Sequence, residues 1–195
     1  MPIRSLAAVA LFTTRLAAQT PAPVAPPPPE QQIAAAVSVL PSEARPGATV
    51  LGYDAAGKLV PLRKGTGDMT CLGTDPKDKN FHVACYHNSM EPFMARGRAL
   101  RASGVKDPEV DSVRFREVRA GKLHMPKGPA VMYQFFGGSF DPATGEVSGA
   151  QPLYVVYIPG ATPQSTGLSA KPSRNAPWIM FPGTPKAHIM FTPKM

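Results

Sequence analysis

Short hydrophobic runs, separated by glycine and proline, dominate the second half of the chain. The runs are rich in aromatic and β-branched side chains, a composition typical of β-strands. Because turn-forming residues lie between them, the pattern predicts consecutive strands, of which the last two form a closing hairpin across Pro182-Gly183. The four runs are PAVMYQFF (129–136), PLYVVYIP (152–159), APWIMF (176–181) and AHIMF (187–191).

Strand signals also occur in the first half of the chain. The segment ATVLGYDAAGKLVPLRKG (48–65) carries apolar residues on both sides of a turn from Asp54 to Gly57, which predicts two neighbouring strands. FHVACYH (81–87) has the composition of a further strand.

A first helix is predicted directly after this strand. Pro92 is well placed as its first residue, because proline is tolerated in the first turn of a helix. The helix runs to about Ala102, and Phe93, Gly97 and Leu100 share one of its faces.

A second helix is expected to begin at Asp107-Pro108 and to continue up to Gly121, since aspartate can cap a helix and proline suits its first turn. The alternation of apolar and charged residues from Val113 to Arg116 also fits a strand. Together the elements predict an α+β fold, a single domain over residues 48–195 with an antiparallel sheet and two short helices on one side.

The N-terminus has the order of a secretory signal peptide. Arg4 supplies positive charge, an apolar run follows from Leu6 to Phe12, and small residues precede Gln19. Residues 1–18 are therefore predicted to be removed on export, and the mature protein to be periplasmic or secreted.

The next segment, 19–47, is predicted to be a proline-rich tether. Six of the nine residues from 21 to 29 are proline, which favours extended polyproline II and a semi-rigid spacer. Residues 31–40 (QQIAAAVSVL) have the composition of a short helix that ends before Pro41.

The charge of the chain narrows the classes of partner. The formal net charge is +8, and it falls to +6 without residues 1–18, which contain Arg4, Arg15 and no acidic residue. This excess favours weak association with anionic surfaces. Nucleic acid is not expected as a partner, because basic and aromatic residues are not interleaved. No transmembrane span is expected in the mature protein, since no apolar run reaches roughly 18 residues.

Several segments resemble an uncharacterised family of exported bacterial proteins that has no assigned activity. The resemblance spans residues 48 to 193 and lies in the order of the segments rather than in a catalytic signature; it implies an exported domain and no particular chemistry. The segments are RKGTGDMTC (63–71), ACY around Cys85, ARGRALRASGV (95–105), GKLHMPKGPAVMY (121–133), FDPATGEV (140–147) and PGTPKAHIM (182–190).

Cys71 and Cys85 are the two cysteines of the chain. An even number of cysteines in an exported protein predicts a disulfide. It would close the polar loop GTDPKDKN (73–80), which has no hydrophobic content of its own. Two separate buried thiols are the alternative. A redox-active pair is disfavoured because the CxxC spacing is missing.

The histidines raise the question of a metal site. His82, His87, His124 and His188, with Asp68 and Glu91, are residue types that bind zinc or iron. His82 and His87, however, are five residues apart, which places them on opposite faces of a strand. HExxH is absent, as are the nucleophile-elbow and phosphate-loop signatures. No metal, cofactor or catalytic residue is therefore assigned.

Two groups of arginines have the same spacing, and clustered arginine binds phosphate or carboxylate. Two solvated helix faces are the simpler interpretation. The groups are Arg96, Arg98 and Arg101, and Arg114, Arg116 and Arg119.

The favoured function is a non-catalytic exported domain that binds a small molecule, an envelope component or a partner protein. The alternative is a metal-assisted hydrolase whose histidines are brought together by the fold. The two differ in whether the histidines converge within ligand distance.

Overall fold

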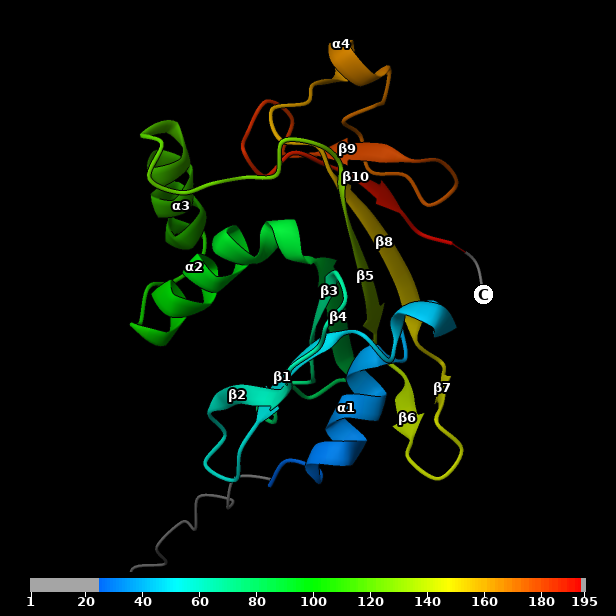
Figure 1. The fold of residues 1–195 in the computed structure, drawn as a ribbon. Coiled ribbons are helices and arrows are strands. Elements are labelled where there is room, and N and C mark those ends of the chain that lie inside the picture. Colours follow the sequence, from blue (N-terminus) through cyan, green and yellow to red (C-terminus); the bar gives the residue numbers. More distant parts are fainter. Residues whose placement is uncertain (1–24, 194–195) are drawn as a thin grey trace, which may run out of the picture.

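The computed structural model describes residues 25–193, and the predicted signal peptide, residues 1–18, lies outside this range. An eight-stranded sheet forms the centre of the molecule, in the order β2-β1-β3-β4-β5-β8-β10-β9 (Figure 1). The remaining two strands form a separate hairpin. The strands are β1 (Thr49–Tyr53), β2 (Leu59–Arg63), β3 (Met69–Leu72), β4 (His82–His87), β5 (Ala130–Phe136), β6 (Ser139–Asp141), β7 (Glu146–Ser148), β8 (Gln151–Tyr157), β9 (Trp178–Met180) and β10 (His188–Phe191).

The sheet is mostly antiparallel, and the predicted α+β class is confirmed. One pair, β1 with β3, is parallel. β2 runs antiparallel to β1 along one of its edges, and the chain then reverses again, so that β3 runs in the direction of β1 along the other edge. The closing hairpin is present as the antiparallel pair β9 and β10. β3, β6 and β7 carry no clear strand signal in the sequence, since each is only three or four residues long.

The two predicted helices, α2 (Glu91–Ala102) and α3 (Glu109–Arg119), pack against each other on one side of the sheet (Figure 1). The region from 113 to 116 is therefore helical rather than extended. The sequence analysis expects Asp107 to cap α3, but its side chain makes no capping hydrogen bond. Asp107 instead forms an ion pair with Arg101 of α2. The short elements are η1 (Ser42–Ala44), η2 (Asn88–Met90) and α4 (Pro163–Thr166). Across residues 25–193 no helix has the length and apolar character needed to cross a membrane.

The short helix expected at residues 31–40 is present as α1 (Pro29–Val37), within the segment interpreted as a tether. Ala36 and Leu40 are almost fully buried, in one hydrophobic cluster with Val50, Val83 and Cys85 of the sheet. The expected boundary of the globular part at residue 48 is therefore corrected: the core includes residues from α1 onward.

The side chain of Gln32 attaches α1 to β1. Its Nε2 donates to the carbonyl oxygens of Pro27 (2.7 Å) and Tyr53 (2.9 Å), and its Oε1 accepts from the backbone N–H of Tyr53 (2.8 Å). Gln32 is 6% exposed, so its side-chain amide is largely shielded from water. A buried amide that is fully bonded fixes the position of the helix on the sheet.

The two cysteines form a disulfide, Cys71–Cys85, with a Cα–Cα distance of 4.0 Å. They are directly opposite each other on the antiparallel strands β3 and β4, and both are fully buried beneath α1. The separation lies just below the usual range of about 4.4–6.8 Å. The bond joins the ends of the exposed loop between these strands, as the sequence predicts.

Candidate functional site

The four histidines lie at separate places. His82 and His87 are at opposite ends of β4, His124 is exposed after α3, and His188 is buried on β10. Of the two acidic candidates, Asp68 is exposed in the turn before β3, whereas Glu91 bonds to other side chains, described below. Within residues 25–193 no group of three or more His, Cys, Asp or Glu side chains is placed to hold a metal ion. The ligand set required by the hydrolase alternative is not assembled in this part of the chain.

The arginines, in contrast, gather where α2 and α3 meet the sheet. Arg114 is the central member: it is 3% exposed, and its guanidinium carbon lies 3.9 Å from the centre of the Phe93 ring. Its Nη1 donates to the carbonyl of Phe93 (3.1 Å), and its Nη2 bonds to the carboxylate of Asp111. The Nε of Arg114 is buried and has no hydrogen-bond partner among the described residues. The expectation of two fully solvated helix faces is therefore wrong at Arg114.

Asp111 connects this arginine to a lysine from the end of the sheet. Its second carboxylate oxygen bonds to Nζ of Lys186 (2.8 Å), which also lies 4.6 Å from the centre of the Phe181 ring. Burial of Asp111 opposes ionisation, but the hydrogen bonds from Lys186 and Arg114 outweigh it and hold the pKa below its usual range. The carboxylate is therefore ionised and shared by two cations.

Gly97 of α2 gives the arginines their space. A Cβ atom at this position would lie 2.8 Å from Nη1 of Arg114 and 3.3 Å from Nη1 of Arg101. Two guanidinium groups thus approach the same point of the helix backbone. Like charges repel, and the carboxylates of Asp107, paired with Arg101, and of Asp111, paired with Arg114, offset this repulsion.

A tyrosine and a third arginine complete the cationic region. Nη1 of Arg98 donates to the hydroxyl of Tyr86 (2.7 Å), and its Nη2 pairs with Glu91 (2.6 Å), to which the tyrosine hydroxyl also bonds. Burial is the main cause that raises the pKa of Tyr86. Burial likewise raises the pKa of Tyr157, on β8, to about 12. Both phenols are therefore neutral hydrogen-bond donors at ordinary pH.

These side chains surround a cavity of about 280 Å³ between α2, α3 and one face of the sheet, here called the arginine crevice. Its charged members were candidates from sequence, except Lys186, which lies far away in the chain. Gln134 and Tyr157 were also missed, since each occurs singly in an apolar run. The lining residues are Leu72, His82, Ala84, Tyr86, Phe93, Met94, Arg98, Arg101, Arg114, Met132, Gln134, Tyr157 and Lys186.

The remaining arginines lie outside the crevice. Arg96 forms a two-point ion pair with Glu117 that links α2 to α3, with a shortest distance of 2.6 Å. This pair raises the pKa of Arg96 and lowers the pKa of Glu117. Arg116 and Arg119 are exposed on α3 and fit the simpler interpretation of a solvated face.

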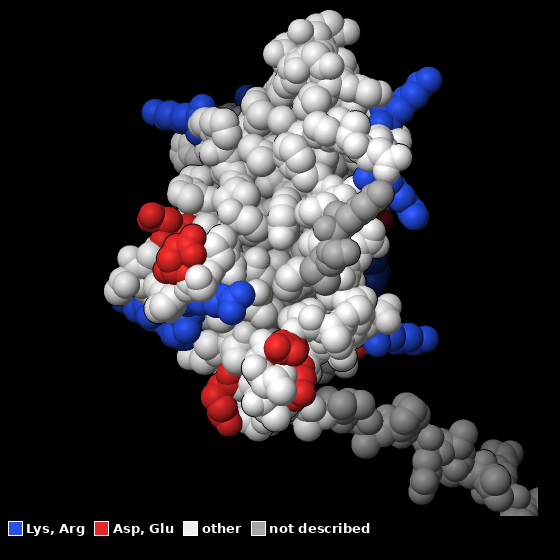
Figure 2. Space-filling view, turned by 90° about the vertical axis from the view of Figure 1, so that its right-hand side faces the viewer, with Lys and Arg blue, Asp and Glu red and all other residues white. Residues whose placement is uncertain are grey.

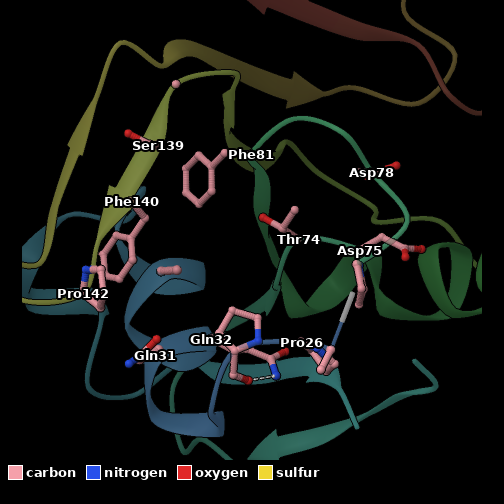
Figure 3. A pocket seen from close by; sticks show the side chains of 15 residues that line it. Pro26, Gln31, Gln32, Thr74, Asp75, Asp78, Phe81, Ser139, Phe140 and Pro142 are labelled. Carbon is pink, nitrogen blue, oxygen red and sulfur yellow. Dashed lines mark hydrogen bonds between the residues drawn. The ribbon is translucent and has the colours of Figure 1, made fainter. Parts of the chain in front are cut away.

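A second hollow, of about 390 Å³, lies between the start of α1, the β3–β4 loop and β6. Figure 3 shows Phe81 and Phe140 in its wall, with Pro26 on the side of the proline-rich segment. The charged residues that line it, Asp75 and Asp78, are both acidic. Its lining therefore offers no positive charge to an anion, in contrast to the arginine crevice.

The side of the molecule seen in Figure 2 is largely uncharged over its centre, and the Lys and Arg side chains visible there lie at the edges. The concentration of cations around α2 and α3 is thus a local feature rather than a property of the whole described surface. Comparison of the chain with protein-family models, with curated proteins and with solved structures finds no match.

Proposed function

We propose that the protein is an exported, non-catalytic binding domain that holds a small anionic ligand in the arginine crevice. The observation that carries the proposal is the buried Nε of Arg114, an N–H group without a hydrogen-bond partner among the described residues. Leaving a buried donor unpaired costs about 1–3 kcal/mol, and more when the group is charged. This N–H has almost no accessible surface in the described structure, so a ligand oxygen pairs with it, and removes the cost, only when the guanidinium shifts toward the crevice.

The charge of the crevice supports the same ligand class. Four cations line it, namely Arg98, Arg101, Arg114 and Lys186. Three carboxylates are bonded to them, from Glu91, Asp107 and Asp111. One positive charge is left over, in a partly buried place where water screens it weakly.

The hydrogen-bonding groups support binding rather than catalysis. The raised pKa values of Tyr86 and Tyr157 keep both phenols protonated, so they are poorly suited to act as general bases. The protonated phenol of Tyr157 and the guanidinium groups are donors that recognise an anion, whereas the hydroxyl proton of Tyr86 is already donated to Glu91.

Export to the periplasm or the medium is part of the proposal. It rests on the signal-peptide pattern of residues 1–18 and is supported by the Cys71–Cys85 disulfide, since disulfides persist in oxidising compartments.

Titration calorimetry of the exported protein with acetate, benzoate, octanoate and inorganic phosphate tests the proposal. We expect at least one of these anions to bind at one site, with weaker binding at high salt. Arg101→Gln should weaken binding about tenfold, whereas Arg116→Gln, on the exposed face of α3, should leave it unchanged. Absence of binding for all four anions, or equal losses in the two variants, would overturn it.

A further inference from the structure

The arginine crevice is elongated, and its two ends differ in chemistry. His82, Ala84 and Tyr86 follow one another on the same face of β4, and Gln134 and Met132 lie opposite Ala84 and Tyr86 on β5. From His82 to Tyr86 the strand advances four residues, or about 13 Å. The floor of the crevice is therefore a track along the strands rather than a round pocket.

The cations are tied to the Tyr86 end of this track. Arg98 bonds to the Tyr86 hydroxyl, and Arg114 lies on the ring of Phe93, which shares a hydrophobic cluster with Tyr86. Arg101 joins them at Gly97. An anionic group of the ligand is expected at this end.

The middle of the track is apolar. Leu72, Ala84 and Met132 come from three adjacent strands, and Met94 faces them from α2. All four side chains are only partly buried, so they keep surface that a ligand can cover. Covering apolar surface stabilises a complex by roughly 25 cal/mol per Å².

The far end of the track carries the polar side chains of His82 and Gln134. His82 stacks on Phe136 with 4.3 Å between ring centres, and its Nε2 lies 3.4 Å from the side-chain oxygen of Gln134. Neither a lysine nor an arginine is among the lining residues that belong to this end of the track. A second anionic group on the ligand would find no cation here.

We propose that the ligand of the arginine crevice is an amphiphilic monocarboxylate, with its carboxylate at Arg114 and Arg101 and its apolar chain lying over Ala84 toward His82. This rests on the proposed function and adds the ligand class. The single unmatched positive charge fits one carboxylate. An extended backbone has three bonds per residue, so a track of four residues accommodates a chain of about ten to twelve atoms.

The test is a chain-length series measured by calorimetry on the exported protein: acetate, butanoate, hexanoate, octanoate and decanoate. Affinity should rise about two- to fourfold for each added methylene, because each is covered by the apolar track. 1-Octanol, the neutral analogue of octanoate, should bind at least tenfold more weakly than octanoate, since it lacks the charge.

Two variants locate the chain on the track. Ala84→Phe places a ring on the floor of the crevice. It should weaken the binding of decanoate at least tenfold while leaving the binding of acetate unchanged. Ala99→Phe, on the exposed face of α2, is the matched control and should change the affinity for neither decanoate nor acetate. If Ala84→Phe fails to fold, the chain-length series on the unmodified protein still tests whether the ligand is a monocarboxylate with an apolar chain.

The outcomes separate the two proposals. If none of the anions binds, the proposed function is wrong and this inference falls with it. If acetate and decanoate bind equally, if phosphate binds more tightly than decanoate, or if folded Ala84→Phe retains decanoate binding, the arginine crevice is an anion site but the monocarboxylate inference is overturned. Equal binding of 1-octanol and octanoate would also overturn it.

Discussion

At the scale of single residues, Gly97 determines whether Arg114 can occupy its place. Gly97→Ala should raise helix propensity by about 1 kcal/mol. The new Cβ, however, would meet the buried guanidinium at 2.8 Å and displace it from the carbonyl of Phe93. Because breaking a buried hydrogen bond to a charged group costs about 1.5–3 kcal/mol, we expect the free energy of unfolding in urea to fall by about 1 kcal/mol.

Ala99→Gly on the exposed face of α2 is the matched control for Gly97→Ala. It should cost about 1 kcal/mol through helix propensity alone, without changing anion binding. A gain in stability for Gly97→Ala would show that the guanidinium moves aside freely.

His188 makes stability depend on pH. Burial lowers its pKa, although the hydrogen bond between its Nδ1 and the carbonyl of Lys186 (2.7 Å) opposes this. The unfolded chain therefore binds a proton more readily than the folded one, so stability falls as pH drops below about 6.5. His188→Asn keeps a donor near the carbonyl and removes the titration.

Urea unfolding at pH 7.5 and pH 5.0 measures this dependence. The difference in the free energy of unfolding between the two pH values should be smaller in His188→Asn than in the unmodified protein. Asp111 affects stability at lower pH. Because its pKa is lowered in the folded protein, its contribution to the free energy of unfolding is lost only as pH falls below the usual carboxyl range. An unchanged pH difference in His188→Asn would assign the effect to other groups.

At the scale of elements, the side chain of Gln32 adds polar bonds to the hydrophobic packing that holds α1 on β1. Gln32→Ala would leave the partly buried backbone N–H of Tyr53 without its partner. We expect a loss of about 1–3 kcal/mol in the free energy of unfolding. Gln31→Ala, one residue earlier in the same helix, should change it by less than about 0.5 kcal/mol. Similar losses for both would mean that helix propensity, not the bonded amide, is decisive.

The disulfide links two strands that are already neighbours in the sheet. Replacing both Cys71 and Cys85 by serine frees a loop of about 15 residues in the unfolded chain and should cost about 2–5 kcal/mol. The midpoint of urea unfolding measures it, with reduced unmodified protein as the reference. A loss below about 1 kcal/mol would indicate that β3 and β4 hold the loop without the covalent bond.

Most of the elements could be predicted from the sequence, because hydrophobic runs, proline and glycine mark their limits locally. The long strands, the β9–β10 hairpin and both helices α2 and α3 are of this kind. The burial of α1 could not be predicted, since it depends on which sheet face lacks a cover. The arginine crevice could be predicted only in part. The arginine spacing pointed to α2 and α3, whereas Lys186 and Tyr157 are brought to the crevice by the order of the strands in the sheet.

At the scale of the whole molecule, the two larger hydrophobic clusters of the described residues lie on opposite faces of the sheet, one under α1 and one under α2 and α3. The disulfide belongs to the first cluster and the arginine crevice borders the second. Formation of the disulfide should therefore stabilise the face opposite the proposed binding site without altering the donors that line it.

Export itself is the last prediction. Protein recovered outside the cytoplasm should begin near Gln19, because the small residues of the signal peptide end there. Intact mass and N-terminal sequencing measure the start, and alkylation without reductant should leave Cys71 and Cys85 unmodified. A chain of residues 19–195 produced in a reducing cytoplasm is the control: its thiols should react, and its thermal midpoint should be lower because it lacks the disulfide. Met1 on the exported form, or free thiols in it, would contradict the assignment of this protein to an oxidising compartment.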